Sequence, residues 1–145
     1  MPALDAAECR RRFAEARRAV LATADADGVP HVVPVTFALL GGPDGTQLVS
    51  AVDHKPKSTT DLRRLRNLAA NPRAALLVDA YDEDWAHLWW VRADGEASIQ
   101  HDGAGREIAL DALAGRYPPY RERRPTGPVV RVHVDRWTGW TAQGV

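Results

Sequence analysis

The stretch that decides the fold is residues 50–78, SAVDHKPKSTTDLRRLRNLAANPRAALLV. A strand-like run leads through a cationic segment into an apolar stripe with helical spacing, formed by Leu62, Leu65, Leu68 and Ala69. Asn71-Pro72 ends this helix, because the residue before a proline avoids the helical region. The apolar run that follows predicts a buried strand over residues 73–81.

The cationic segment holds an unusual pair of lysines. Only two of the nineteen Lys and Arg residues are lysines, Lys55 and Lys57. An ammonium group binds phosphate as a point charge, and the backbone N–H groups and dipole at a helix start also favour anions. With Ser58, the lysines therefore predict a phosphate site at the start of a helix over residues 57–70. The alternative is that they are solvated turn residues, and His54 could equally touch the phosphate or lie in solvent.

Composition limits the class of protein. The 145 residues fit one domain, residues 1–145, that folds without disulfides. The single Cys9 cannot form an internal disulfide, and the first residues lack the apolar stretch of a signal peptide, so we expect a cytoplasmic protein. No apolar run approaches the roughly 18 residues that span a membrane. The formal net charge of zero argues against a nucleic-acid binder that relies on overall positive potential.

The rest of the chain consists of short predicted elements. The spacing predicts a helix capped by Asp5 over residues 4–18, strands over 19–23, 31–40, 46–52, 85–99 and 128–141, a helix over 105–114 and a mobile loop over 118–127. Pro30 and Pro34 lack the N–H that a central strand needs, so they indicate an edge or bulge, and Gly95 indicates a bulge. Six strands with three outer helices predict a closed or nearly closed antiparallel barrel.

Several motifs occur in a familiar order: Leu21-Ala22-Thr23, Asp27-Gly28-Val29-Pro30, Val33-Pro34-Val35-Thr36-Phe37, residues 50–75 and residues 89–95. In this order they resemble the flavin- and deazaflavin-binding split β-barrel family related to pyridoxamine phosphate oxidase. The chain is most similar to the branch of coenzyme F-420-dependent oxidoreductases. The resemblance covers nearly the whole chain and implies a mainly β fold with flanking helices, a six-stranded antiparallel split β-barrel of the FMN-binding type.

The resemblance also implies a homodimer with two cofactor sites in grooves at the subunit interface, a small-molecule substrate, and no nucleic-acid or membrane partner. Lys55, Lys57 and Ser58 would hold the cofactor phosphate. The segments lining the ring would be Pro34, Val35 and Thr36, with Ser50, Ala51 and Val52. Trp85 and either Trp89 or Trp90 would come from the partner subunit to close the pocket.

The implied cofactor is coenzyme F-420, an 8-hydroxy-5-deazaflavin, and the implied activity is hydride transfer to or from a small organic acceptor. FMN is the alternative, because similar lysines would hold a monophosphate. The glutamate tail of F-420 needs a further basic surface, which would be Arg63, Arg64 and Arg66 unless they are only the solvated side of the helix. The Arg-Leu-His ending of a true pyridoxamine phosphate oxidase is missing, so that activity is not expected. A non-catalytic cofactor carrier and a nucleic-acid-binding module are further alternatives.

The sequence predicts neither a catalytic side chain nor a metal site. In this family the cofactor carries the reaction while the protein binds and orients it. The five histidines lack the spacing of a zinc site. The acidic residues Asp79, Asp82, Glu83 and Asp84 lack the glycine and final glutamate of a calcium-binding EF-hand loop.

Overall fold

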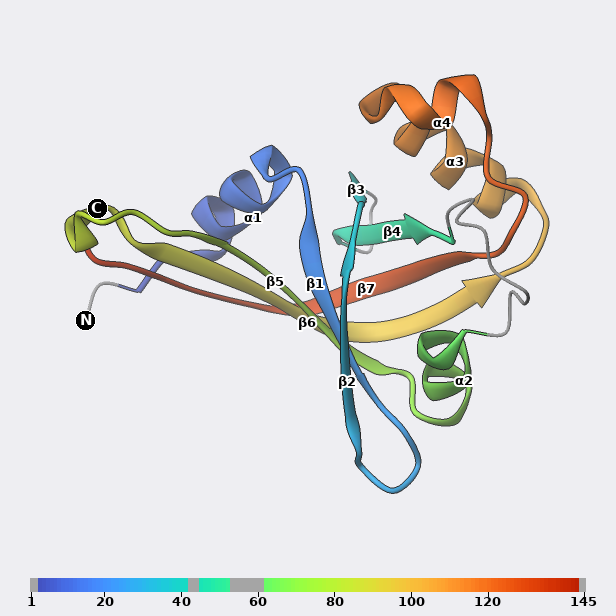
Figure 1. Cartoon of the computed structure of the whole chain (residues 1–145), viewed down its shortest axis with the longest axis horizontal. Coiled ribbons are helices and arrows are strands. Elements are labelled where there is room, and N and C mark those ends of the chain that lie inside the picture. The colour runs from blue at the N-terminus through green and yellow to red at the C-terminus, as the bar shows by residue number, and fades with distance from the viewer. Residues whose placement is uncertain (1–2, 42–44, 53–61, 144–145) are drawn as a thin grey trace.

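The computed structural model describes residues 3–41, 45–52 and 62–143 (Figure 1). In these residues seven strands form one antiparallel sheet in the order β2-β1-β5-β6-β7-β4-β3. The strands are β1 (Ala19–Ala24), β2 (Pro30–Val35), β3 (Ala38–Leu40), β4 (Gln47–Ala51), β5 (Arg73–Ala80), β6 (Trp89–Gln100) and β7 (Val129–Thr141). The helices are α1 (Ala6–Glu15), α2 (Arg63–Ala70), α3 (Ala104–Arg116) and α4 (Pro118–Glu122), with a 3-10 turn η1 (Trp85–His87).

The sheet curls because its two outermost strands are consecutive in the chain. Only Thr36 and Phe37 separate β2 from β3, which lie at opposite ends of the strand order. A link of this length reaches roughly 10 Å, so the sheet must bend round to bring its ends together. In Figure 1 the two strands follow one another in a nearly straight line across the sheet. The predicted antiparallel split barrel is therefore confirmed.

The strand count of six was wrong, because the strand predicted over residues 31–40 is interrupted. The backbone N–H of Phe37 donates to the Tyr117 hydroxyl at 3.2 Å, and the Phe37 carbonyl accepts from the same hydroxyl at 3.0 Å. Both backbone groups of Phe37 are thus bonded to a side chain, and the strand divides into β2 and β3.

The main core lies between α1 and the inner face of the sheet. Cys9 and Phe13 of α1 are fully buried, and the Phe13 ring meets Phe37 at 4.9 Å and Trp137 at 5.5 Å between centroids. The predicted cap is confirmed, since the Asp5 carboxylate accepts the Glu8 N–H at 2.8 Å. The helix is shorter than the predicted residues 4–18 because its backbone becomes extended again at Ala16.

A second core lies under α3 and α4. Leu110 and Leu113 of α3 are fully buried and pack with Val49 of β4 and Val129 of β7. The mobile loop predicted over residues 118–127 was wrong for its first half, which forms α4. Its two prolines stand at the first helical positions, where a missing N–H costs nothing, and Tyr120 anchors the helix with only 8 % of its surface exposed.

The predicted edge strand and the predicted bulge are both confirmed. β2 pairs only with β1, so Pro30 and Pro34 lie on an edge strand. The register between β6 and β7 shifts at Gly95, where a Cβ atom would lie 2.1 Å from the His133 carbonyl oxygen. The strand predicted from residue 85 begins only at Trp89, because Asp84 caps η1 by accepting the Ala86 N–H at 3.1 Å.

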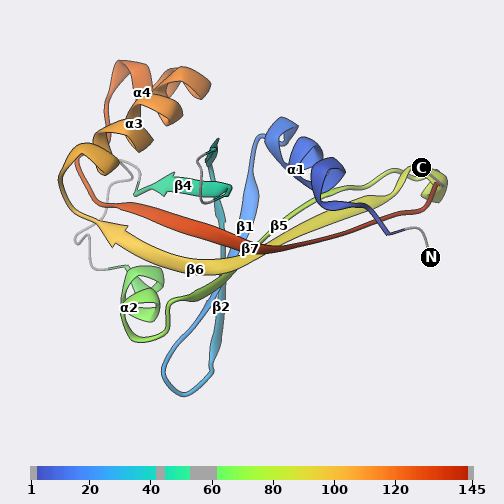
Figure 2. The ribbon, with the colours of Figure 1, turned by 180° about the vertical axis from the view of Figure 1, so that it is seen from behind.

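The sheet is elongated on one side. β5, β6 and β7 run on together past α1 as a narrow arm that ends near η1, and the view from behind shows the same arrangement (Figure 2). No helix in the described parts of the chain has the length and apolar character to cross a membrane.

The α2 stripe gives the first prediction. Leu68 is 4 % exposed in the main core and Leu65 is partly buried against it, whereas Ala69, expected in the stripe, is exposed. Leu68→Ala should lower the free energy of unfolding by about 2–5 kcal/mol, and Leu65→Ala by less, because less contact is lost. Urea denaturation measures both, with Arg63→Ala as an exposed control. An equal or larger loss for Leu65→Ala would contradict this packing.

Candidate functional site

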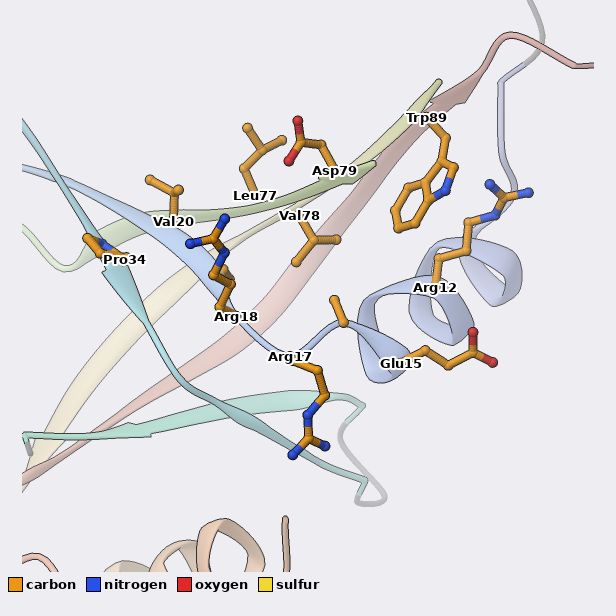
Figure 3. Close-up of a pocket in the computed structure, with 12 residues that line it drawn as sticks. Arg12, Glu15, Arg17, Arg18, Val20, Pro34, Leu77, Val78, Asp79 and Trp89 are labelled. Carbon is orange, nitrogen blue, oxygen red and sulfur yellow. The ribbon is translucent and has the colours of Figure 1, made fainter. Parts of the chain in front are cut away.

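A pocket of about 640 Å³ lies beside the end of α1, where β1 and β5 diverge (Figure 3). Its apolar wall consists of Ala16, Ala19, Val20, Pro34, Leu77, Val78 and Trp89. Its charged lining consists of Arg12, Glu15, Arg17, Arg18 and Asp79. Pro34 and Trp89 stand at opposite sides of the pocket in Figure 3.

The pocket exists because neighbouring strands differ in length. β1 pairs with β5 only up to Val20, which faces Leu77. β5 and β6 continue together to Ala80 and Trp89, beyond the point where β1 begins. The chain between α1 and β1 therefore passes a notch beside the longer strands. Val20 and Leu77 are each 40 % exposed at its edge, as the alternation of a strand buried on one face requires.

Three of the charged lining residues already have partners. Arg12 donates to Glu8 at 2.6 Å, and its guanidinium lies 5.2 Å from the centre of the Trp89 ring. Arg17 donates to the Arg116 carbonyl at 2.8 Å. Glu15 pairs with Arg11 at 2.9 Å. These contacts hold the α1 side of the pocket in place.

Arg18 and Asp79 differ from the other charges. Both are exposed, and neither makes a hydrogen bond or ion pair with any residue that the structure describes. In Figure 3 the Arg18 guanidinium extends toward Val20 and Leu77, and the Asp79 carboxylate stands beside Leu77. A cation and an anion with no partner among the described residues thus lie near Val20 and Leu77, the two exposed apolar side chains at this edge.

Of the residues predicted to line the cofactor ring, the structure brings Pro34 and Trp89 to this pocket. Val35 is buried in the main core, and the Thr36 hydroxyl lies 2.8 Å from the Tyr120 hydroxyl. Ser50, Ala51 and Val52 are buried, with 9, 7 and 7 % of their surfaces exposed.

Two other groups of predicted residues lie elsewhere. Trp85 is 68 % exposed in η1 and does not line the pocket. Lys55, Lys57 and Ser58, with His54, lie outside the described residues. The helix predicted to start at residue 57 has its first helical residue at Arg63, since the Leu62 backbone is extended.

The charged lining of the pocket was not predicted. Arg18 fell at the end of the helix predicted over residues 4–18, whereas it directly precedes β1. Asp79 was considered only as a metal ligand, yet it alternates with the buried residue Val78 and therefore lies on the outer face of β5. No cluster of His, Cys, Asp or Glu in the described part of the chain could hold a metal ion.

A family model, that of pyridoxamine 5'-phosphate oxidase, matches residues 6–141. The chain belongs to this family. Membership agrees with the resemblance read from the sequence, although it does not distinguish the F-420 branch from others. A search of curated proteins found no match.

Solved structures show the same fold. A conserved hypothetical protein from Mycobacterium tuberculosis is 21% identical, with a TM-score of 0.74 over 96% of this chain and 86% of that one. An FAD-binding protein from Mesorhizobium loti is 22% identical, with a TM-score of 0.72 over 94% of this chain and 93% of that one. A heme storage protein from Vibrio cholerae is 17% identical, with a TM-score of 0.67 over 94% and 93%. At these identities the likeness establishes the fold alone.

The pocket has the character of a small-molecule site. Its volume of about 640 Å³ lies within the range of roughly 300–1,000 Å³ typical of such sites. An apolar wall with a few charged groups suits a flat aromatic ring that carries polar substituents. The residues present therefore fit a flavin-type ring or a small aromatic acceptor.

The Glu8 carboxylate that holds Arg12 gives a pH prediction. Hydrogen bonds from Arg11 and Arg12 lower the pKa of Glu8 from 4.5 to about 2. Because the pKa of Glu8 is lower in the folded state, its ionised carboxylate stabilises the folded protein above pH 4.5. This stabilisation is lost as the pH falls from 4.5 toward 2. Glu8→Gln should therefore flatten the dependence of stability on pH in this interval. Urea midpoints measured across it, with Glu122→Gln as control, test this. A slope equal to that of the wild type would contradict the role of Glu8.

Proposed function

We propose that this protein is an oxidoreductase that binds a flavin-type cofactor and transfers hydride between it and a small organic acceptor. Coenzyme F-420 is the proposed cofactor and FMN the second candidate. When bound, either ring supplies the hydride chemistry. The observation that carries the proposal is the pocket that Pro34 and Trp89 both line, with apolar side chains and the charges of Arg18 and Asp79.

The protein's own residues bind, orient and exclude water. Lys55 and Lys57 would hold the phosphate, as the sequence predicts. Pro34 would lie near the ring, and the rest of the pocket, toward Trp89, would receive the acceptor. Removing water from this wall strengthens every charged contact made inside it. The chain therefore needs no catalytic side chain of its own for hydride transfer.

FMN is the second candidate cofactor because of one structurally similar protein. The similar protein from Mesorhizobium loti is described as FAD-binding, and its fold is that of this chain. Heme storage, the role named for the Vibrio cholerae neighbour, is less well supported. Haem iron is held by His, Cys, Met or Tyr side chains, and the described residues that line the pocket include none of them.

Direct titration decides between the cofactors. The purified protein should quench the fluorescence of F-420 with a dissociation constant in the micromolar range or below, at low salt. A yellow protein that binds FMN and not F-420 would select the second candidate. Failure to bind either compound would refute the proposed function. Turnover with a panel of quinone-like acceptors then separates an enzyme from a cofactor carrier.

The lysine pair gives a mutational prediction. Replacing both Lys55 and Lys57 by Ala should weaken cofactor binding by about 2–4 kcal/mol, because two charge-assisted contacts to phosphate are lost. Isothermal titration measures the affinity, and circular dichroism should show an unchanged fold. Arg123→Ala, at an exposed arginine, is the matched control. An affinity equal to that of the control would remove the lysines from the site.

We also propose that the protein is a homodimer that pairs through the outer face of the sheet. Val32, Val20 and Leu77 are 63, 40 and 40 % exposed on this face. Strand pairing puts Val32 beside Ala22 and Ala22 beside Ala75, so the centre is apolar and flat. A second copy of the same flat surface would cover it in a two-fold symmetric contact.

The same face continues along the arm. Thr138 pairs with Arg92 and Trp140 with Trp90, all on its outer side. Because Val20 and Leu77 also line the pocket, the partner would cover one of its sides.

Val32→Asp should convert the dimer to a monomer, because it places a charge at the centre of the apolar contact. Sedimentation velocity or light scattering measures the mass, and the exposed position of Val32 should leave the fold intact. Ile108→Asp, at a side chain 56 % exposed on α3, is the control and should remain dimeric. A wild-type monomer at tens of micromolar concentration would refute the proposed dimer.

A further inference from the structure

The pocket has two sides, because it lies at the edge of β5 that β1 leaves open beyond Leu77. Leu77 and Asp79 are exposed on the outer face of β5, whereas Val78 is buried on the inner face. Trp89 lies on the inner side as well, since it pairs with Ala80 and packs against the core that contains Val78. A dimer contact through the outer face would not cover this inner side.

Arg12 of α1 holds the Trp89 ring on the inner side. The Arg12 guanidinium lies over this ring, 5.2 Å from its centre. In Figure 3 the ring stands between the Arg12 guanidinium and Val78. Only 19 % of the Arg12 side chain is exposed, and a cation–π contact is stronger where water is excluded. Arg12 is thus placed to fix the orientation of the indole that borders the pocket.

Arg12 is itself fixed by Glu8. The Arg12 Nε donates to the Glu8 carboxylate at 2.6 Å, across one turn of α1. Hydrogen bonds from Arg11 and Arg12 lower the pKa of Glu8 to about 2, so this carboxylate is ionised near neutral pH. A charge-assisted hydrogen bond therefore anchors one side of the guanidinium and limits the positions that it can take over the ring.

The neighbouring Arg11 provides a contrast within the same helix. Arg11 also bonds the Glu8 carboxylate, with its Nε at 2.9 Å and its Nη2 at 2.7 Å, but its side chain is 56 % exposed. Of these two arginines only Arg12 lines the pocket and lies over Trp89. The ion pair with Glu8 and the contact with the indole can therefore be tested separately.

We infer that Arg12 is a positioning residue, which holds the Trp89 ring in the orientation that receives the planar acceptor, and that Glu8 in turn positions Arg12. This inference rests on the proposed function, because the acceptor would bind toward Trp89. Arg12 acts through the indole and does not need to touch the acceptor. A ring already held in one orientation binds a flat ligand without first losing its own conformational freedom.

Fluorine NMR of the protein labelled with 5-fluorotryptophan tests the positioning without any ligand. The Trp89 signal is the one that disappears in Trp89→Phe. Arg12→Gln should shift or broaden this signal, and Glu8→Gln should do the same, whereas Arg11→Gln should leave it unchanged. Trp137 is an internal control, because its ring also packs against α1 and would report a general disturbance of the helix.

Menadione, a planar quinone, tests the consequence for binding. Its titration into the wild-type protein should move the Trp89 signal more than that of Trp85, which is exposed and does not line the pocket. Arg12→Gln should weaken this binding about threefold to tenfold, the size of one partly shielded cation–π contact. Arg12→Lys, which keeps the cation, should retain most of the affinity, and Arg11→Gln should bind as the wild type does.

The outcomes separate this inference from the proposed function. An unchanged Trp89 signal in Arg12→Gln, an equal change of the Trp137 signal, or a Trp89 signal that menadione does not move would overturn the inference. Equal effects of Arg12→Gln and Arg11→Gln in a protein that binds F-420 or FMN would overturn the inference alone. The expected signals and menadione affinities in a protein that binds neither cofactor would overturn the proposed function alone.

Discussion

The barrel depends on one hydroxyl group at the junction of β2 and β3. The Tyr117 hydroxyl accepts the Phe37 N–H at 3.2 Å, and its oxygen lies 2.9 Å from the Arg17 carbonyl oxygen and 3.0 Å from the Phe37 carbonyl oxygen, to which it can donate its single hydrogen. Arg116 adds a hydrogen bond of 2.7 Å to the Ala14 carbonyl. The end of α3, the end of α1 and the corner of the barrel are thus joined at one point. Without the Tyr117 hydroxyl, the backbone N–H and carbonyl of Phe37 would lack their partner inside the protein.

This junction also positions the pocket. Arg17 carries both the carbonyl that bonds Tyr117 and the guanidinium that bonds the Arg116 carbonyl, so the chain leaving α1 is fixed on both sides of its backbone. Arg18 follows directly and stands just before β1. The polar side of the pocket is therefore set by the same contacts that close the barrel, although its apolar wall comes from β1 and β5. The hydrogen bonds of Tyr117, Arg17 and Arg116 therefore hold both the barrel corner and the polar side of the pocket in place.

Local signals in the sequence predicted the parts of the fold that local chemistry controls. The Asp5 cap, the edge strand with its prolines and the bulge at Gly95 each follow from the backbone chemistry of one or two residues. The division of the strand at Phe37 could not be predicted, because its cause is a tyrosine 80 positions away. The helix α4 was missed for a similar reason, since burial of Tyr120 against the barrel outweighs the proline-rich composition.

The lining residues of the pocket likewise divide into those that the sequence predicted and those that it did not. Pro34 and Trp89 were predicted from motifs and both line the pocket, whereas Arg18 and Asp79 line it only because β5 extends past the start of β1. That difference in strand length cannot be read from either strand alone. The register of β1 and β5 positions the pocket, and part of its charged lining comes from residues just beyond that pairing. The same fold occurs in proteins described as FAD-binding and as heme storage. The fold by itself therefore does not set the ligand, which depends on the residues placed at the site.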